Sequence, residues 1–145
     1  MTGITFTDGN DISYHTYTRW GLGMTSMDIG LPEVKSHKID LPGADGVRDM
    51  SEIFGRVLYG NRRLVFTFDH EDRNYTNFIT TLTSISECLH GKYMKVVLDL
   101  DPDYYYEGRV TVEHAKDDQV YSIVTITVDA QPYKTRISDP TVKKL

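Results

Sequence analysis

The 145-residue chain contains a single cysteine, Cys88, and so no second thiol that could share a metal ion with it. One cysteine cannot make an intrachain disulfide, so packing and hydrogen bonds must stabilise the fold. The chain also lacks any apolar run near the ~20 residues that cross a bilayer, and residues 1–10 have neither the basic nor the apolar region of a signal peptide. We therefore expect that the protein does not associate with a membrane and that it is synthesised in the cytosol.

Positive charge is scarce as well. The chain has 16 Lys and Arg against 21 Asp and Glu, a net charge of −5. Binding to nucleic acid normally depends on clustered Lys and Arg that neutralise phosphates, so we expect no specific nucleic-acid binding. Apolar residues make up 39% and charged residues 26%, values that are typical of a folded domain, and the length suits one core.

A calcium-binding loop is suggested by Asp99, Asp101 and Asp103, which occupy alternate positions as in the first half of an EF-hand. The sixth position should be Gly but is Tyr104, and the twelfth should be Glu but is Val110. The pattern therefore favours a solvated hairpin turn and predicts no metal site.

Catalytic motifs are equally incomplete. The acidic stretch 69–72 surrounds His70, but it precedes a predicted helix, where acidic residues are favoured by the helix dipole. Cys88 and His90 are two residues apart on that helix and point to opposite sides, which prevents thiol activation. The Gly-rich stretch 21–26 lacks the final Gly of a dinucleotide fingerprint and is interpreted as a flexible or bulged connector. We expect no catalytic residue, no cofactor and no enzymatic activity.

Most of the chain has the alternation of β-strands. The predicted strands, separated by turn residues, are 4–7, 11–18, 34–41, 64–68, 93–98, 105–114 and 120–130, with a further possible strand at 55–59. Strand residues on one side share a face, so Phe66, Phe68 and Ile126 are predicted core residues.

One segment has helical periodicity. The apolar residues recur at intervals of three and four and predict a helix from Tyr75 to Leu89; they are Tyr75, Phe78, Ile79, Leu82, Ile85 and Leu89. Asp72 or Asn74 is a candidate N-cap, Gly91 suits the left-handed residue after the helix, and Leu82 is a predicted core residue.

The fold class that follows is α+β and mainly β. Two packed antiparallel sheets, a β-sandwich, are expected to carry one helix within a single domain at residues 1–137. Residues 138–145 are polar and are expected to form a frayed C-terminal tail.

Two apolar features are candidates for subunit contacts. The segment 20–31 is too apolar for a solvated loop and contains Trp20, Leu22, Met24, Met27, Ile29 and Leu31. A neighbouring subunit could cover these side chains, or the segment could fold back over its own sheet. The tyrosines 104–106, Tyr105 among them, fit a core, an interface or a sugar-stacking surface.

Several stretches together resemble the N-terminal, ring-forming domain of the distal tail (Dit) proteins of siphophages. In chain order they are Pro42-Gly43-Ala44-Asp45-Gly46 with Asp49-Met50-Ser51, Tyr59-Gly60-Asn61-Arg62 with Phe66-Thr67-Phe68, Leu89-His90-Gly91-Lys92, Tyr104-Tyr105-Tyr106-Glu107-Gly108-Arg109, and Gln131-Pro132-Tyr133-Lys134. The resemblance covers about residues 11–134, and Met50 stands where the family more often has Leu.

The resemblance implies a tail-tube-like β-sandwich with one helix and a projecting hairpin. It further implies a homohexameric ring in the virion tail, made in the host bacterial cytoplasm, which joins the tail tube to the tail tip or baseplate and lets DNA pass. Longer members of the family carry a C-terminal carbohydrate-binding domain. The alternative interpretation of this chain is a glycan-binding module of a phage tail or baseplate.

Overall fold

The computed structural model of the chain describes residues 2–53, 55–70, 75–114 and 123–145. In chain order the elements are β1 (Ile4–Thr7), β2 (Ser13–His15), α1 (Thr16–Trp20), β3 (Leu22–Ile29), β4 (Lys38–Asp40), β5 (Val47–Asp49), β6 (Arg62–His70), α2 (Tyr75–Leu89), β7 (Tyr93–Leu98), β8 (Asp101–His114), β9 (Ile123–Ala130), β10 (Lys134–Arg136) and β11 (Lys143–Lys144). Within these described ranges, neither helix has the length and apolar character that a bilayer span requires.

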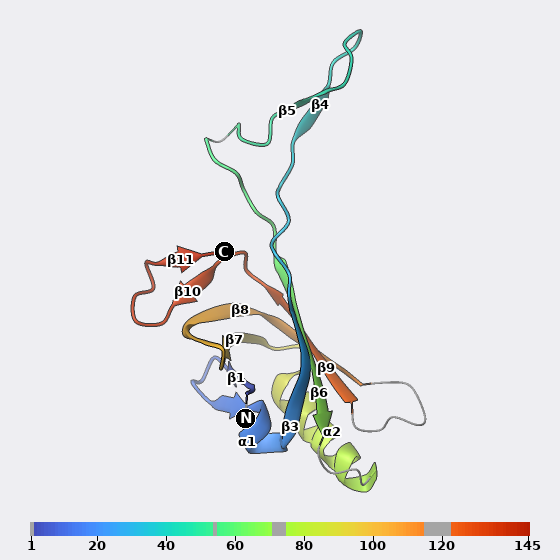
Figure 1. Cartoon of the computed structure of the whole chain (residues 1–145), viewed down its shortest axis with the longest axis vertical. Coiled ribbons are helices and arrows are strands. Elements are labelled where there is room, and N and C mark those ends of the chain that lie inside the picture. The colour runs from blue at the N-terminus through green and yellow to red at the C-terminus, as the bar shows by residue number, and fades with distance from the viewer. Residues whose placement is uncertain (1, 54, 71–74, 115–122) are drawn as a thin grey trace.

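The strands confirm the predicted class, mainly β with antiparallel pairing, a packed helix and a projecting hairpin (Figure 1). The main sheet has the order β2-β1-β7-β8-β9-β6-β3, and β10 and β11 extend from β8. The long strand β8 joins the half of the sheet formed by β2, β1 and β7 to the half formed by β9, β6 and β3. Its first part pairs with β7, and its second part pairs with β9. The two layers expected from the sequence are therefore continuous through β8.

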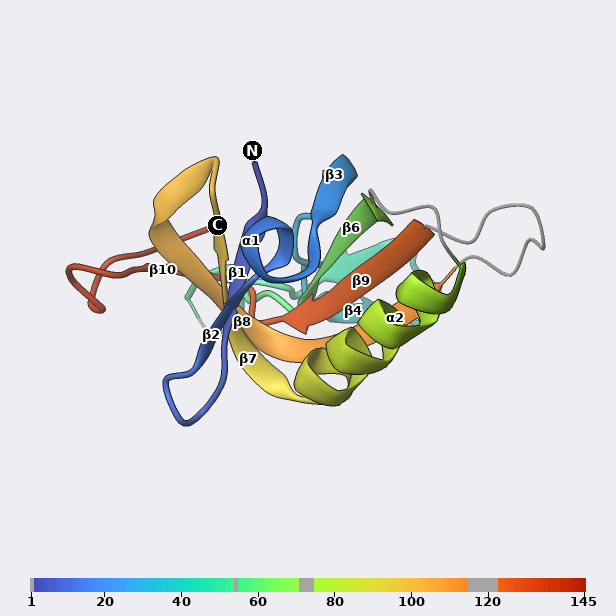
Figure 2. The same ribbon diagram turned by 90° about the horizontal axis from the view of Figure 1, so that it is seen from below.

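The core lies inside the curled sheet, as the view from below makes plain (Figure 2). Strand alternation sends one face of each strand inward, and Phe66 on β6 lies opposite Ile126 on β9. The fully buried residues of these two strands are Leu64, Phe66, Phe68, Val124, Ile126, Val128 and Ala130. The core positions predicted on both strands are confirmed.

The predicted helix is confirmed as α2, which packs against β8 (Figure 2). Phe78, Ile85 and Leu89 are buried, whereas Leu82 is half-buried and Ile79 is exposed, so the buried stripe is narrower than predicted. Gly91 has a φ of 77°, as expected after a helix end. The candidate caps Asp72 and Asn74 lie outside the described residues.

The predicted strand 11–18 is wrong in its second half. The strand β2 ends at His15, and the short helix α1 follows, because His15 Nδ1 accepts the Thr18 N–H at 3.2 Å as a helix cap. Gly21, with a φ of 67°, ends α1 and turns the chain into β3. The stretch predicted as a connector is therefore largely a strand.

Other boundaries also differ from the predictions. Residues 55–59 form no strand in the described part of the segment, where Tyr59 makes a single bridge to Val34. The prediction that residues 138–145 are frayed is wrong, because Lys143–Lys144 pairs with β10 and closes a hairpin. The predicted turn at 99–103 is shorter, since β8 begins at Asp101, and the turn predicted at 116–119 lies outside the described residues.

Residues 31–61, called the arm below, project far from the sheet (Figure 1). The predicted strand 34–41 is reduced there to β4, which pairs with β5 in the outer part of the arm. Closer to the sheet, the two limbs are joined by backbone hydrogen bonds from Gly60 N–H to Glu33 O at 2.7 Å and from Lys35 N–H to Leu58 O at 2.8 Å. The arm is thus a ribbon of two limbs, and none of its described residues belongs to the hydrophobic core.

Candidate subunit interface

The interface role predicted for Trp20 and Leu22 is corrected by the structure. Leu22 is fully buried and Trp20 is 7% exposed, both in the subunit's own core. Trp20 stacks on Tyr14 with ring centroids 5.9 Å apart, and its indole N–H donates to Ser84 Oγ at 3.2 Å. The segment is apolar because it folds back over its own sheet, so neither side chain is available to a neighbour.

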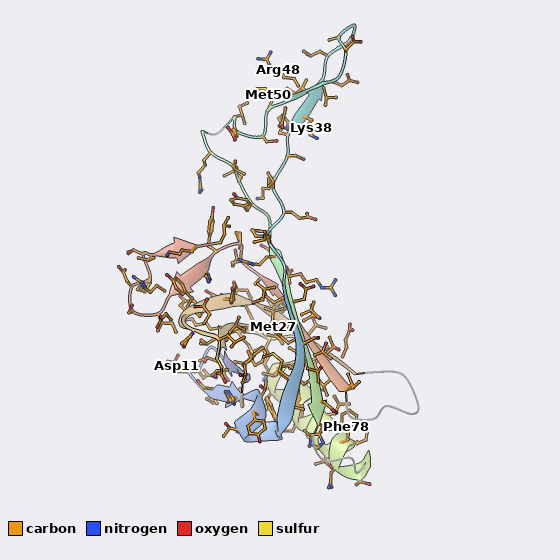
Figure 3. All side chains as sticks on the ribbon, in the orientation of Figure 1. Asp11, Met27, Lys38, Arg48, Met50 and Phe78 are labelled. Atoms are coloured by element: carbon orange, nitrogen blue, oxygen red, sulfur yellow. The ribbon has the colours of Figure 1, made fainter. Side chains whose placement is uncertain are left out.

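The other candidates in this segment lie along an edge of the sheet. Met24, Met27 and Ile29 are half-buried on β3, and Figure 3 labels Met27 there. In the described chain the eight-residue strand β3 pairs only with β6, so the backbone groups on its other edge are not paired with a strand. A register shift between Met24 and Ser26 is the main interruption. An open edge of this length can accept a strand from another chain.

Leu31 is 77% exposed at the start of the arm, and it is one of a set. Six of the twelve exposed large apolar residues in the described chain lie on the arm, namely Leu31, Val34, Ile39, Leu41, Val47 and Ile53. Exposed apolar side chains gathered on one element make that element a candidate for contact with a partner. Of these six residues the sequence predicts only Leu31 as a contact candidate, because residues 34–41 are predicted as an ordinary strand of the sheets.

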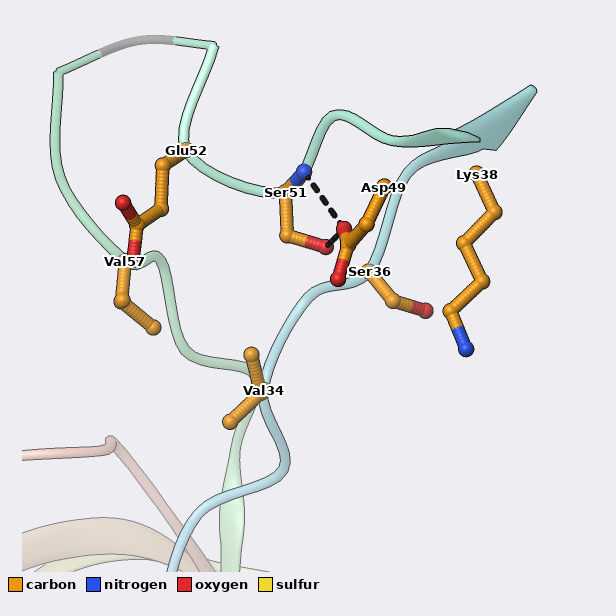
Figure 4. Close-up of a pocket in the computed structure, with 7 residues that line it drawn as sticks. All are labelled: Val34, Ser36, Lys38, Asp49, Ser51, Glu52 and Val57. Atoms are coloured by element: carbon orange, nitrogen blue, oxygen red, sulfur yellow. Dashed lines mark hydrogen bonds between the residues drawn. The ribbon is translucent and has the colours of Figure 1, made fainter. Parts of the chain in front are cut away.

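A hollow of about 490 Å³ lies between the limbs of the arm. Val34 and Val57 line one part of it, and Lys38, Asp49 and Glu52 line the rest together with two serines (Figure 4). The Ser51 hydroxyl and then its backbone N–H donate to Asp49, and these bonds hold the pKa of that carboxyl below its usual value. The hollow therefore combines apolar wall with an ionised carboxylate.

A second hollow of about 260 Å³ is lined mainly by apolar atoms of the arm. Met50, Ile53 and Leu58 supply most of its wall, and Lys35 and His37 border it. The larger hollow has a volume within the range of small-molecule pockets, and the smaller one lies just below that range.

The tyrosines 104–106 are arranged differently from an open stacking platform. Tyr104 and Tyr106 are buried and Tyr105 is half-buried on the opposite face of β8. Cations of the same chain lie over the rings: Lys134 over Tyr104 at 4.8 Å, Lys95 over Tyr105 at 5.0 Å and Arg62 over Tyr106 at 5.2 Å. These rings are engaged within the subunit, and nothing in their geometry favours sugar stacking.

The three aspartates at 99–103 do not converge. Asp99 accepts the Gly3 N–H and contacts His15 Nε2, both at 2.9 Å, while Asp101 pairs with Lys134 at 2.6 Å. No group of three or more potential metal ligands occurs among the residues that the structure describes.

The residues considered for catalysis are also separated. His70 is buried at the end of β6 with its ring edge-on to Phe78, and residues 71–72 lie outside the described ranges. His90 Nδ1 accepts the Val112 N–H at 3.0 Å, whereas Cys88 packs against the core. The geometry thus assembles no nucleophile with a base from these residues.

The fold defined by this curled sheet, its helix and its arm is similar to that of a solved phage protein. The chain is similar to a solved structure described as the Dit (gp 19.1) protein of phage SPP1, a paradigm of the hub adsorption apparatus in phages that infect Gram-positive bacteria. The TM-score is 0.68 at 16% identity, over 92% of this chain and 52% of that one. This chain therefore spans about half the length of the SPP1 protein. The resemblance noted in the sequence is confirmed at the level of the fold.

No family model and no curated protein matches the sequence.

Proposed function

We propose that the protein is a structural subunit of a phage tail, a distal tail ring subunit that joins the tail tube to the tail tip or baseplate. The observation that carries this proposal is the likeness to the SPP1 hub protein, which extends over 92% of this chain. Residues 1–137 would carry the ring domain, with polar residues 138–145 completing the β10–β11 hairpin. The role is architectural and needs no catalytic residue.

A closed homo-oligomer, most simply a hexamer, suits the two unlike surfaces of the subunit. One surface is the apolar arm, and the other is the sheet, with its open β3 edge. A head-to-tail contact between unlike surfaces closes into a ring when its rotation divides a full turn. Leu31, Ile53 and the β3 edge residues Met24, Met27 and Ile29 are the proposed contact residues.

The net charge of −5 fits a ring through which DNA passes. Like charge keeps the phosphate backbone from adhering to the wall of the channel. The other partners would be the tail tube on one side and the tip or baseplate proteins on the other, in the virion tail after synthesis in the host bacterial cytoplasm.

Native mass spectrometry with negative-stain electron microscopy tests the ring. We expect a single closed species of defined subunit number, with a central channel. Leu31→Asp with Ile53→Asp should remove that species while leaving the cooperative melt of the monomer unchanged. Ile12→Asp is the matched control, because Ile12 is also exposed but lies in the β1–β2 turn, away from the arm.

A protein that stays monomeric at high concentration would contradict self-assembly. Retention of the ring by the doubly substituted arm would instead remove the arm from the interface. A glycan array serves as the counter-test: sugar binding by a monomer would favour the glycan-binding alternative.

A further inference from the structure

Arg62, the first residue of β6, lies where the arm rejoins the sheet. It is only 3% exposed, although it carries a full charge. No carboxylate of the described residues lies within ion-pair distance of its guanidinium. A buried charge is costly unless it is hydrogen-bonded, so the contacts that hold Arg62 show what its burial accomplishes.

The guanidinium joins segments that are distant in the sequence. Its Nε–H donates to Gly30 O at 2.9 Å and an Nη1–H donates to Pro132 O at 3.3 Å. Its Cζ lies 5.2 Å from the centre of the Tyr106 ring on β8. Arg62 thus connects Gly30, the residue directly before the arm, with the β9–β10 connection and the middle of the sheet.

The backbone at Gly30 is packed tightly against the start of β6. Gly30 N–H donates to Arg63 O at 2.9 Å, and a Cβ on Gly30 would lie 2.8 Å from that same oxygen. Near the base of the arm, the rings of Tyr59 and Tyr133 also lie edge-to-face, with their centroids 6.0 Å apart. The direction in which the arm leaves the sheet is therefore set by a small group of contacts, and Arg62 makes the polar side-chain ones.

We propose that Arg62 is a positioning residue that fixes the direction of the arm and thereby the number of subunits in the ring. The inference rests on the proposed function. A head-to-tail ring closes only at one rotation per subunit, so a change in the angle of the contacting element changes or prevents closure. Lysine cannot replace arginine here, because one ammonium group lacks the planar fork that reaches two carbonyl groups and stacks on a ring.

Two variants and a neighbouring control separate this role from simple stability. Arg62→Met removes both hydrogen bonds, and Arg62→Lys keeps the charge but not the fork. Arg63→Met is the matched control, since Arg63 is the next residue and is exposed. Losing a hydrogen bond from a charged group is enough to change a conformational population about tenfold, so the fraction of closed rings should fall by about that factor in both Arg62 variants.

The direction of the arm is measured independently of the ring by electron–electron double resonance on dilute monomer. Spin labels are placed through Asp45→Cys on the arm and Glu113→Cys on β8, in a Cys88→Ser background. We expect a narrow distance distribution for the parent and for Arg63→Met, and a broader or shifted one for both Arg62 variants. If Arg62→Met does not fold, Arg62→Lys carries the test.

The outcomes for the two proposals are distinct. If the parent forms no ring, the ring proposal is contradicted. If its spin-label distance distribution is nevertheless narrow, and the Arg62 variants broaden it, the role of Arg62 in positioning the arm is still supported. An unchanged distribution in both Arg62 variants, or a parent as broad as they are, overturns the role of Arg62. Unchanged rings with a changed distribution overturn the link between arm direction and subunit number.

Discussion

Gly108 lies where β8 passes from one half of the sheet to the other, paired with Met94 on one side and with Ala130 on the other. A Cβ at this position would be 2.2 Å from Asp129 O and 2.6 Å from the Ala130 Cα. A carbon atom normally stays about 3.3 Å or more from a carbonyl oxygen, so Gly108→Ala must push the strands apart by roughly 1 Å. Both obstacles are backbone atoms, which have no side-chain rotation to relieve the clash.

The cost follows from that displacement. Overpacking of this kind costs about 1–3 kcal/mol, and each lost backbone hydrogen bond costs about 1 kcal/mol more. The hydrogen bond from Gln131 N–H to Glu107 O, which is 2.9 Å long, lies beside the clash and should be the first to break. We therefore expect Gly108→Ala to lower the free energy of unfolding by about 2–5 kcal/mol.

Urea denaturation followed by fluorescence measures this loss, because Trp20 is the single tryptophan and is buried. Gly9→Ala is the control: a Cβ there meets nothing within 4 Å, so the change should stay within about 0.5 kcal/mol. A loss below about 1 kcal/mol for Gly108→Ala, with an unchanged denaturant slope, would refute the close crossing of β8 and β9.

Phe66→Ala should cost about 3–5 kcal/mol, whereas Leu82→Ala, at a half-buried position, should cost clearly less; equal losses in urea denaturation would contradict the observed orientation of α2. The hydrogen bond that Lys134 donates to the Asp101 carboxylate raises the Lys134 pKa above 10.5. The contribution of this pair to the free energy of unfolding is therefore present below pH 10.5 and is lost as pH rises through the raised pKa. Lys134→Met should flatten the loss of stability above about pH 10.5, and an unchanged alkaline slope in urea denaturation would refute the pairing. Calcium should leave the melting temperature within scatter, and a rise that Asp101→Ala abolishes would reveal a site that the geometry does not support.

Local patterns predicted much of the secondary structure. Residues 64–68 place Leu64, Phe66 and Phe68 on one face of a strand, and 75–89 repeat at helical intervals; both periods follow from backbone geometry alone. These elements became β6 and α2. The helix α1 was missed because it is five residues long and depends on one cap from His15, a residue that is uncommon at this position.

The candidate interface was harder to predict. An apolar side chain has the same sequence signal whether its own core or a neighbour covers it, and the structure assigns Trp20 and Leu22 to the core. The residues 34–41 show the reverse case, since they were predicted as a strand of the packed sheets, yet the segment projects into solvent. Sequence reasoning found the stretch 20–31 but could not divide it between core and edge.

By itself, then, the sequence determined the class of the fold, the positions of the principal strands and helix, and a set of motifs similar to distal tail proteins, because local periodicity and turn chemistry depend only on near neighbours in the chain. Tertiary structure decided which apolar residues remain exposed on the arm, how β8 unites the two halves of the sheet, and where the guanidinium of Arg62 lies. Those properties depend on contacts between residues far apart in the sequence, such as Arg62 with Pro132, and no local pattern specifies them.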